Sequence, residues 1–97
     1  MKKIQHGSQD SSKRKHRIAV AQSAAQRLLT QDEVHLNWFE RRWFNSAAVG
    51  NRRAMMERLE QRIQDALPKG YIVKVTYTYS SPYTGILKSC VITRRII

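Results

Sequence analysis

The sequence predicts a small α+β protein with a flexible basic N-terminal arm, about three helices and a C-terminal antiparallel β-hairpin. A chain of 97 residues is long enough for one compact domain that buries about two thirds of its unfolded surface. Between residues 18 and 67 apolar side chains recur at three- and four-residue steps, as in helices, and from residue 71 onward they alternate, as in strands. We therefore expect an arm over residues 1–17 and a single domain over residues 18–97.

The expected arm is strongly basic and poor in apolar residues. Residues 1–17 contain six Lys and Arg against one Asp, and Met1 and Ile4 are their only large apolar side chains. Such a segment buries too little apolar surface to offset the entropy lost on ordering. Its charge allows two interpretations: an arm that binds phosphate or an acidic partner and orders on contact, or a solvated tail that aids solubility. The basic residues nearest the domain are Lys13, Arg14, Lys15 and Arg17.

Two helices are expected in the first half of the domain. Over residues 17–29 Ala is abundant, Gly and Pro are absent and apolar residues keep helical spacing, so a first helix is favoured. Thr30 and Glu33 then match a capping box, in which the Thr hydroxyl accepts from the Glu amide and the Glu side chain reaches back to the Thr amide. We therefore expect a second helix over residues 31–45.

The expected second helix carries the unusual stretch NWFERRWFN at residues 37–45. At about 100° per residue its aromatic side chains point in three directions, which one small core does not easily cover. Either two of these faces are buried between neighbouring elements, or Trp38 or Phe44 stays exposed beside the arginines. Exposed aromatic and Arg side chains are enriched at protein interface hot spots, and aromatic and guanidinium planes also accept nucleic-acid bases.

A third helix and the hairpin complete the expected domain. Apolar residues from 52 to 67 form one stripe of a helix, which ends before Pro68 because proline disfavours helical geometry at the residue before it. Residues 71–79 alternate as a half-buried strand, and turn residues over 80–85 lead into a second β-rich run over 86–93. Because two strands alone are marginally stable, the third helix should pack across one side of them.

The chain offers little for catalysis. His35 is the only histidine outside the expected arm, and Cys90 lies mid-strand, where the role of a small apolar residue is the default. There is no zinc-type spacing of Cys and His, no phosphate-binding glycine loop and no Gly-x-Ser-x-Gly motif. We therefore expect no enzyme activity, no metal and no cofactor. One cysteine, no long apolar stretch and no signal-peptide pattern at the start indicate a reducing cytoplasm.

The net charge of +11 indicates attraction to a negative partner. Three classes remain: a modulator that docks on an acidic or nucleic-acid-handling protein complex, a small DNA- or RNA-binding protein, and a structural subunit or assembly factor. A nucleic-acid binder should lose affinity steeply with salt, whereas a protein-targeted modulator should depend more on its aromatic side chains. No helix-turn-helix, ribbon-helix-helix or RNA-binding sheet signature is present, which disfavours the second class.

The whole chain, and especially NWFERRWFN at 37–45 and DALPKGY at 65–71, resembles the small anti-RecBCD proteins of lambdoid temperate phages, the second of the adjacent anti-RecBCD pair. The resemblance rests on length, segment order, basicity and Pro68. It implies a phage modulator that binds the host RecBCD helicase-nuclease through its RecC subunit. Such a modulator would act in the host cytoplasm, alter the response to the recombination signal Chi and turn DNA-end processing toward phage recombination. The resemblance also implies association with a host cyclophilin-type prolyl isomerase.

These partners would meet different parts of the chain. For the isomerase, the expected site is the Leu67–Pro68 bond, followed by Lys69 and Gly70. For RecBCD, the expected docking surface comprises Trp38, Arg41, Arg42, Trp43 and Phe44. Electrostatic support, including contact with DNA phosphates, is expected from Lys13, Arg14, Lys15 and Arg17.

Overall fold

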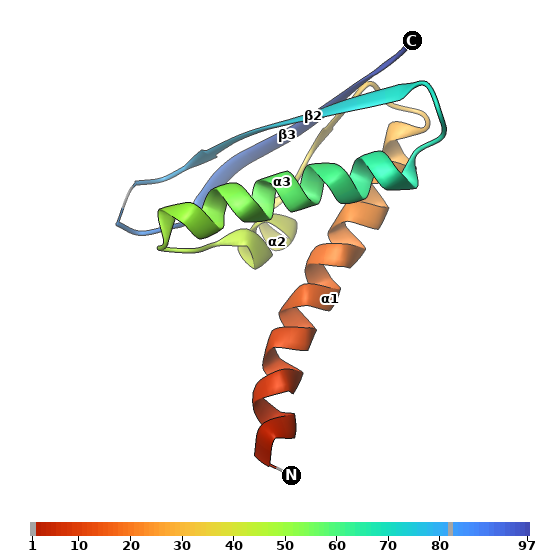
Figure 1. Cartoon of the computed structure of the whole chain (residues 1–97). Coiled ribbons are helices and arrows are strands. Elements are labelled where there is room, and N and C mark those ends of the chain that lie inside the picture. Colours follow the sequence, from red (N-terminus) through yellow and green to blue (C-terminus); the bar gives the residue numbers. More distant parts are fainter. Residues whose placement is uncertain (1, 82) are drawn as a thin grey trace.

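The computed structural model describes residues 2–81 and 83–97, with side chains from residue 12 onward. The elements are the helices α1 (Lys2–Leu28), α2 (Trp38–Arg41) and α3 (Val49–Ala66), the 3-10 helix η1 (Arg42–Phe44), and the strands β1 (Glu33–His35), β2 (Tyr71–Tyr79) and β3 (Leu87–Ile96). The predicted α+β class and the C-terminal antiparallel hairpin are confirmed (Figure 1).

The three strands form one antiparallel sheet in the order β1-β3-β2. β2 and β3 are the predicted hairpin, paired from Tyr71 opposite Ile96 to Tyr79 opposite Leu87. β1, which the sequence did not lead us to expect, pairs with the other side of β3. β3 is therefore the central strand, and both of its edges are covered.

The core lies between the sheet and the helices, which cover one face of it (Figure 1). Side chains of β2 alternate as predicted: Val73 is buried, Val75 is half-buried and Lys74 between them is exposed. The core is formed by side chains of α1, η1, α3 and the strands, for example Leu28, Phe44, Leu59, Ile63 and Ile92. Every helix in the described part of the chain is too short or too polar to qualify as a membrane span.

Polar side chains of α3 cover part of the outer edge of β2. Gln64 donates from Nε2 to the carbonyl oxygen of Tyr71 at 2.6 Å, and its Oε1 accepts from the backbone N–H of Val73 at 3.1 Å. Oε2 of Glu60 accepts from the N–H of Val75 at 2.9 Å. Edge strands present unpaired backbone groups that attract further strands. These three bonds satisfy such groups and fix α3 across the sheet.

The predicted helix over residues 31–45 is wrong. Its first part forms β1, and only the single turns of α2 and η1 are helical. Val34 and Leu36 are both buried, so the chain here follows the two-residue period of a strand, and pairing with β3 outweighs local helix preference. A capping box is present, but its members are Asn37 and Glu40, downstream of the predicted pair.

The first helix begins at Lys2 and not at Arg17, so the backbone of the expected arm over residues 1–17 is helical where it is described. Lys and Arg favour helix, and tertiary contacts reinforce this preference at the end nearest the sheet. There the ring of His16 stacks on Trp43 with ring centroids 3.9 Å apart. Arg17 donates from Nη1 to the carbonyl oxygen of Trp43 at 3.3 Å. The last residues of the expected arm are therefore part of the folded domain.

The third predicted helix corresponds to α3, which begins at Val49, earlier than expected, and ends before Pro68, as expected. Its N-cap makes no side-chain hydrogen bond. The buried Arg52 stabilises this end, because it donates from Nε to the carbonyl oxygen of Ser46 at 2.7 Å and from Nη2 to that of Ala47 at 3.3 Å. A charged donor thus holds the loop that leads into α3.

Candidate interaction surface

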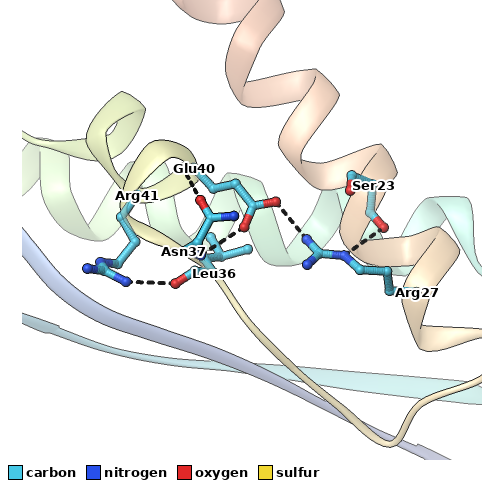
Figure 2. Close-up of polar contacts among 6 residues, drawn as sticks. All are labelled: Ser23, Arg27, Leu36, Asn37, Glu40 and Arg41. Carbon is cyan, nitrogen blue, oxygen red and sulfur yellow. Dashed lines mark hydrogen bonds and ion pairs between the residues drawn. The ribbon is translucent and has the colours of Figure 1, made fainter.

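The aromatic stretch is positioned by a reciprocal cap at the start of α2. Oδ1 of Asn37 accepts from the backbone N–H of Glu40 at 2.9 Å, and Oε1 of Glu40 accepts from the N–H of Asn37 at 2.9 Å (Figure 2). This capping box fixes the direction in which the first turn leaves β1. Trp38 and Phe39 are the first two residues of that turn.

Two arginines then tie α2 to its neighbours. Arg27 of α1 forms an ion pair with Glu40, with 2.7 Å between Nη2 and Oε2 (Figure 2). Arg41 donates from Nη1 to the carbonyl oxygen of Leu36 at 2.7 Å and from Nε to that of Leu87 at 3.1 Å. These contacts hold one short turn against both α1 and β3. The side chains that project from it are therefore presented on a rigid base.

Trp38 and Phe39 are each 62% exposed and lie edge to face, with ring centroids 5.6 Å apart. The guanidinium carbon of Arg42 lies 4.6 Å from the Phe39 ring centroid and 5.9 Å from that of Trp38. We call Trp38, Phe39 and Arg42 the aromatic patch. Large exposed rings with an Arg above them are the side chains that most often anchor protein interfaces.

The structure separates the five residues predicted for docking. Trp38 and Arg42 belong to the aromatic patch, and the half-buried Trp43 lies beneath it, with Arg42 4.4 Å from its ring centroid. Phe44 is 1% exposed and belongs to the core, so the prediction that it contacts a partner is wrong. Its ring points inward because η1 turns the chain toward the loop before α3. Arg41 is engaged in the contacts described above.

Phe39 is the functional candidate that sequence reasoning missed. The error came from treating residues 31–45 as one long helix, in which Phe39 is an interior position and not part of a first turn. The three-residue spacing of Asn37 and Glu40 could have indicated the exposure of Phe39, because a capping box at these positions begins the helix at Trp38. The first turn of a helix that begins at the surface exposes its leading side chains.

A groove of about 560 Å³ lies between α1, η1 and the first half of α3. Its cationic lining residues, which we call the basic groove, are Lys13, Arg17, Arg42 and Arg58. None of the described residues that line it is Asp or Glu. Partial burial, followed by the charges of Arg58, Arg14 and Arg17, lowers the pKa of Arg62. Positive charge is thus concentrated along the facing sides of α1 and α3.

The predicted isomerase segment forms an exposed turn between α3 and β2. Leu67 is anchored in the core, whereas Pro68 and Lys69 are exposed, and the described peptide bonds, including Leu67–Pro68, are trans. Gly70 has a φ of +93°, which residues with a side chain rarely adopt. Pro68 is therefore accessible at the surface without being part of a helix.

The groups considered for catalysis do not come together. Cys90 is buried, and burial raises the pKa of its thiol to about 12, so it lacks the thiolate character of a nucleophile. His35 is exposed and lies 3.0 Å from the carboxylate of Glu33. Within the described residues, no three His, Cys, Asp or Glu side chains are grouped closely enough to hold a metal ion.

Comparison with known protein families, curated proteins and solved structures gave no match to this chain.

Proposed function

We propose that this protein is a phage-encoded modulator that binds the host RecBCD helicase-nuclease through the RecC subunit. In this proposal it acts in the host cytoplasm, alters the response of the complex to Chi and favours phage recombination at DNA ends. The proposal is supported by the sequence resemblance at residues 37–45 and 65–71, by the net charge of +11 and by the aromatic patch.

The aromatic patch is the observation that carries the proposal. Two large rings, each about two thirds exposed, stand side by side on a turn that is anchored from both sides. A partner that covers these rings buries their exposed apolar surface and gains binding free energy from it. The entropic cost is small, because the backbone that carries the rings is already fixed. Interfaces usually depend on a few aromatic and Arg side chains of this kind, which each contribute about 2 kcal/mol or more.

The charge of the chain suits a complex that handles DNA ends. A strongly basic protein is attracted both to acidic protein surfaces and to phosphates, which raises the rate of encounter. Lys13, Arg14, Lys15 and Arg17 lie on α1 on either side of His16, whose ring stacks on Trp43, and Trp43 in turn contacts Arg42 of the aromatic patch. In the proposal they support docking, while the aromatic patch supplies most of the affinity.

The isomerase association is proposed for the turn of Leu67, Pro68, Lys69 and Gly70. Prolyl isomerases need access to an X-Pro bond whose flanking backbone is not held in a helix or a sheet. Pro68 meets this requirement, because α3 ends at Ala66 and β2 begins at Tyr71.

The docking proposal is tested by measuring the affinity of purified variants for purified RecBCD. Trp38→Ala and Phe39→Ala should each weaken binding by about 30-fold, which corresponds to about 2 kcal/mol at a hot spot. Lys13→Ala should weaken it less, because exposed single charges contribute little. Tyr83→Ala is the matched control, since that ring is 87% exposed and lies in the turn between β2 and β3.

A larger loss for Lys13→Ala than for the aromatic variants would contradict the role of the patch. Wild-type protein that fails to bind RecBCD, or that binds without changing its Chi response, would refute the proposed function. Far-ultraviolet circular dichroism of each variant checks that the loss comes from the surface and not from unfolding.

A further inference from the structure

The basic groove collects cations from three different elements. Lys13 and Arg17 come from α1, Arg42 from η1 and Arg58 from α3. Two of these cations also make contacts within the protein, because Arg17 donates to the carbonyl oxygen of Trp43 and Arg42 donates to that of Phe39. The four like charges nevertheless face one another across an open space of about 560 Å³ whose described lining contains no carboxylate. Such an arrangement raises the electrostatic potential of the groove and suits a multiply charged anion.

We propose that the basic groove binds the sugar-phosphate backbone of single-stranded nucleic acid. This inference goes beyond the docking on RecBCD, because it requires no host protein and uses side chains outside the exposed rings of Trp38 and Phe39.

Phosphate fits this lining better than isolated carboxylates do. Three of the four cations are arginines, whose planar guanidinium donates two parallel hydrogen bonds to a phosphate. They are spread over both sides of the groove, and Arg14 and Arg62 add charge close to them. A nucleic-acid backbone carries one negative charge per nucleotide and can meet several of these cations in succession.

The size of the groove favours one strand. A groove of about 560 Å³ can hold a short stretch of one sugar-phosphate backbone, whereas a whole duplex, whose major groove alone is about 12 Å wide, is too large to enter it. Backbone recognition without base reading is expected, because the indole of Trp43, the aromatic residue in the lining, already contacts His16 and Arg42. The groove should therefore bind without sequence preference.

The test uses the purified full chain and a fluorescein-labelled mixed-sequence DNA strand of about 16 nucleotides, followed by fluorescence anisotropy over a range of salt concentrations. Wild-type protein should bind the single strand, more tightly than a blunt duplex of the same length. Unlabelled poly-glutamate should displace the strand much less effectively than an unlabelled strand of equal charge.

The groove is probed by the double variant Lys13→Gln with Arg58→Gln, which removes one cation from each of its facing sides. The matched control is Lys15→Gln with Arg53→Gln, which removes the same charges from the same two helices outside the groove. Arg53 forms an exposed i, i+4 ion pair with Glu57, so its loss should cost little stability. The groove variant should bind about tenfold more weakly, and its salt slope should fall by about 1.4, which corresponds to two lost phosphate contacts. The control should bind within about twofold of wild type.

Equal losses in both double variants would show that net charge acts alone and would overturn the groove assignment. Binding of the duplex as tight as that of the single strand, or tighter, would overturn the assignment to single strands. Efficient displacement of the strand by poly-glutamate would overturn the assignment to phosphate. RecBCD is absent from these measurements. A negative result for nucleic-acid binding would therefore not contradict docking on RecBCD, and a negative result for docking would not contradict nucleic-acid binding by the groove.

Discussion

Tyr79 is a single residue that links the aromatic stretch to the sheet. Its hydroxyl donates to the carbonyl oxygen of Phe44 at 2.7 Å, and the guanidinium carbon of Arg52 lies 4.9 Å from its ring centroid. Burial raises the pKa of Tyr79 from 10.0 to about 12. The fold thus favours the neutral phenol, so this contribution to stability is complete below about pH 10 and is lost as the pH rises to about 12.

Tyr79→Phe should lower the free energy of unfolding at neutral pH by about 1 kcal/mol, because the carbonyl oxygen of Phe44 loses its donor. The variant should also lose less stability than wild type between about pH 10 and pH 12, since Phe does not ionise. Urea unfolding across this pH range measures both effects. Tyr83→Phe, at an exposed ring, is the control and should match wild type. Parallel alkaline curves for Tyr79→Phe and wild type would contradict the assignment.

At the residue scale the sequence predicts which chemistry is present but not which side chains remain exposed. Trp38 and Arg42 were predicted to lie at the surface, and they do. Phe44 was predicted to lie there as well but is in the core, and the exposed Phe39 was not among the predicted residues. Exposure here depends on where a one-turn helix starts and stops. That is decided by contacts distant in sequence, such as the bond from Arg41 to Leu87, which no local pattern contains.

Gly85 shows how two elements meet at close range. It has a φ of +68°, and its carbonyl oxygen accepts from the N–H of Ser46 at 2.8 Å, which joins the turn of the hairpin to the loop before α3. A Cβ at this position would overlap the carbonyl group of Ser46 and lie 2.6 Å from the nitrogen of Ala47. Both the backbone conformation and the space available therefore require glycine.

Gly85→Ala should destabilise the protein by about 3 kcal/mol or more, because backbone strain and displacement of the loop add. Thermal unfolding followed by circular dichroism measures the loss. Gly50→Ala is the matched control: nothing lies within 4 Å of the added methyl group, and the position is helical, so stability should stay equal or rise slightly. A Gly85→Ala variant as stable as Gly50→Ala would show that the loop yields without cost.

At the element scale, long segments with one clear period were predictable and short ones were not. β2 and α3 each have enough repeats for the pattern to outweigh a single deviating residue, and both were found near their predicted bounds. β1 has three residues and becomes a strand only because β3 is available beside it. Thr30 and Glu33 have the residue types and spacing of a capping box, but the backbone from Glu33 to His35 pairs with β3 and does not form the first turn of a helix.

At the scale of the whole molecule, the two proposed protein partners are assigned to different ends of α3. Its 18 residues span about 27 Å, and Pro68 follows its last turn, whereas η1 lines the basic groove together with the first half of α3. The basic groove lies on the side of α1 and the start of α3. The isomerase turn and the basic groove therefore lie at different ends of α3, whereas the groove and the aromatic patch share Arg42.

Pro68→Ala should abolish co-purification of the host prolyl isomerase while leaving affinity for RecBCD unchanged, and Trp38→Ala should do the reverse. The physical reason is that Pro68 is exposed in the turn after α3, whereas Trp38 is exposed at the start of α2, so each substitution changes a different surface. Affinity purification from host lysate, with circular dichroism to verify α3, measures both. Isomerase that stays bound to Pro68→Ala would remove this turn from the proposal.

The bonds from Glu60 and Gln64 to β2 also affect how two copies of this protein can meet at high concentration. A neighbouring chain that approaches Tyr71, Val73 and Val75 meets donors and acceptors that are already satisfied. Along this stretch of β2, a second copy therefore finds no free backbone group with which to extend the sheet.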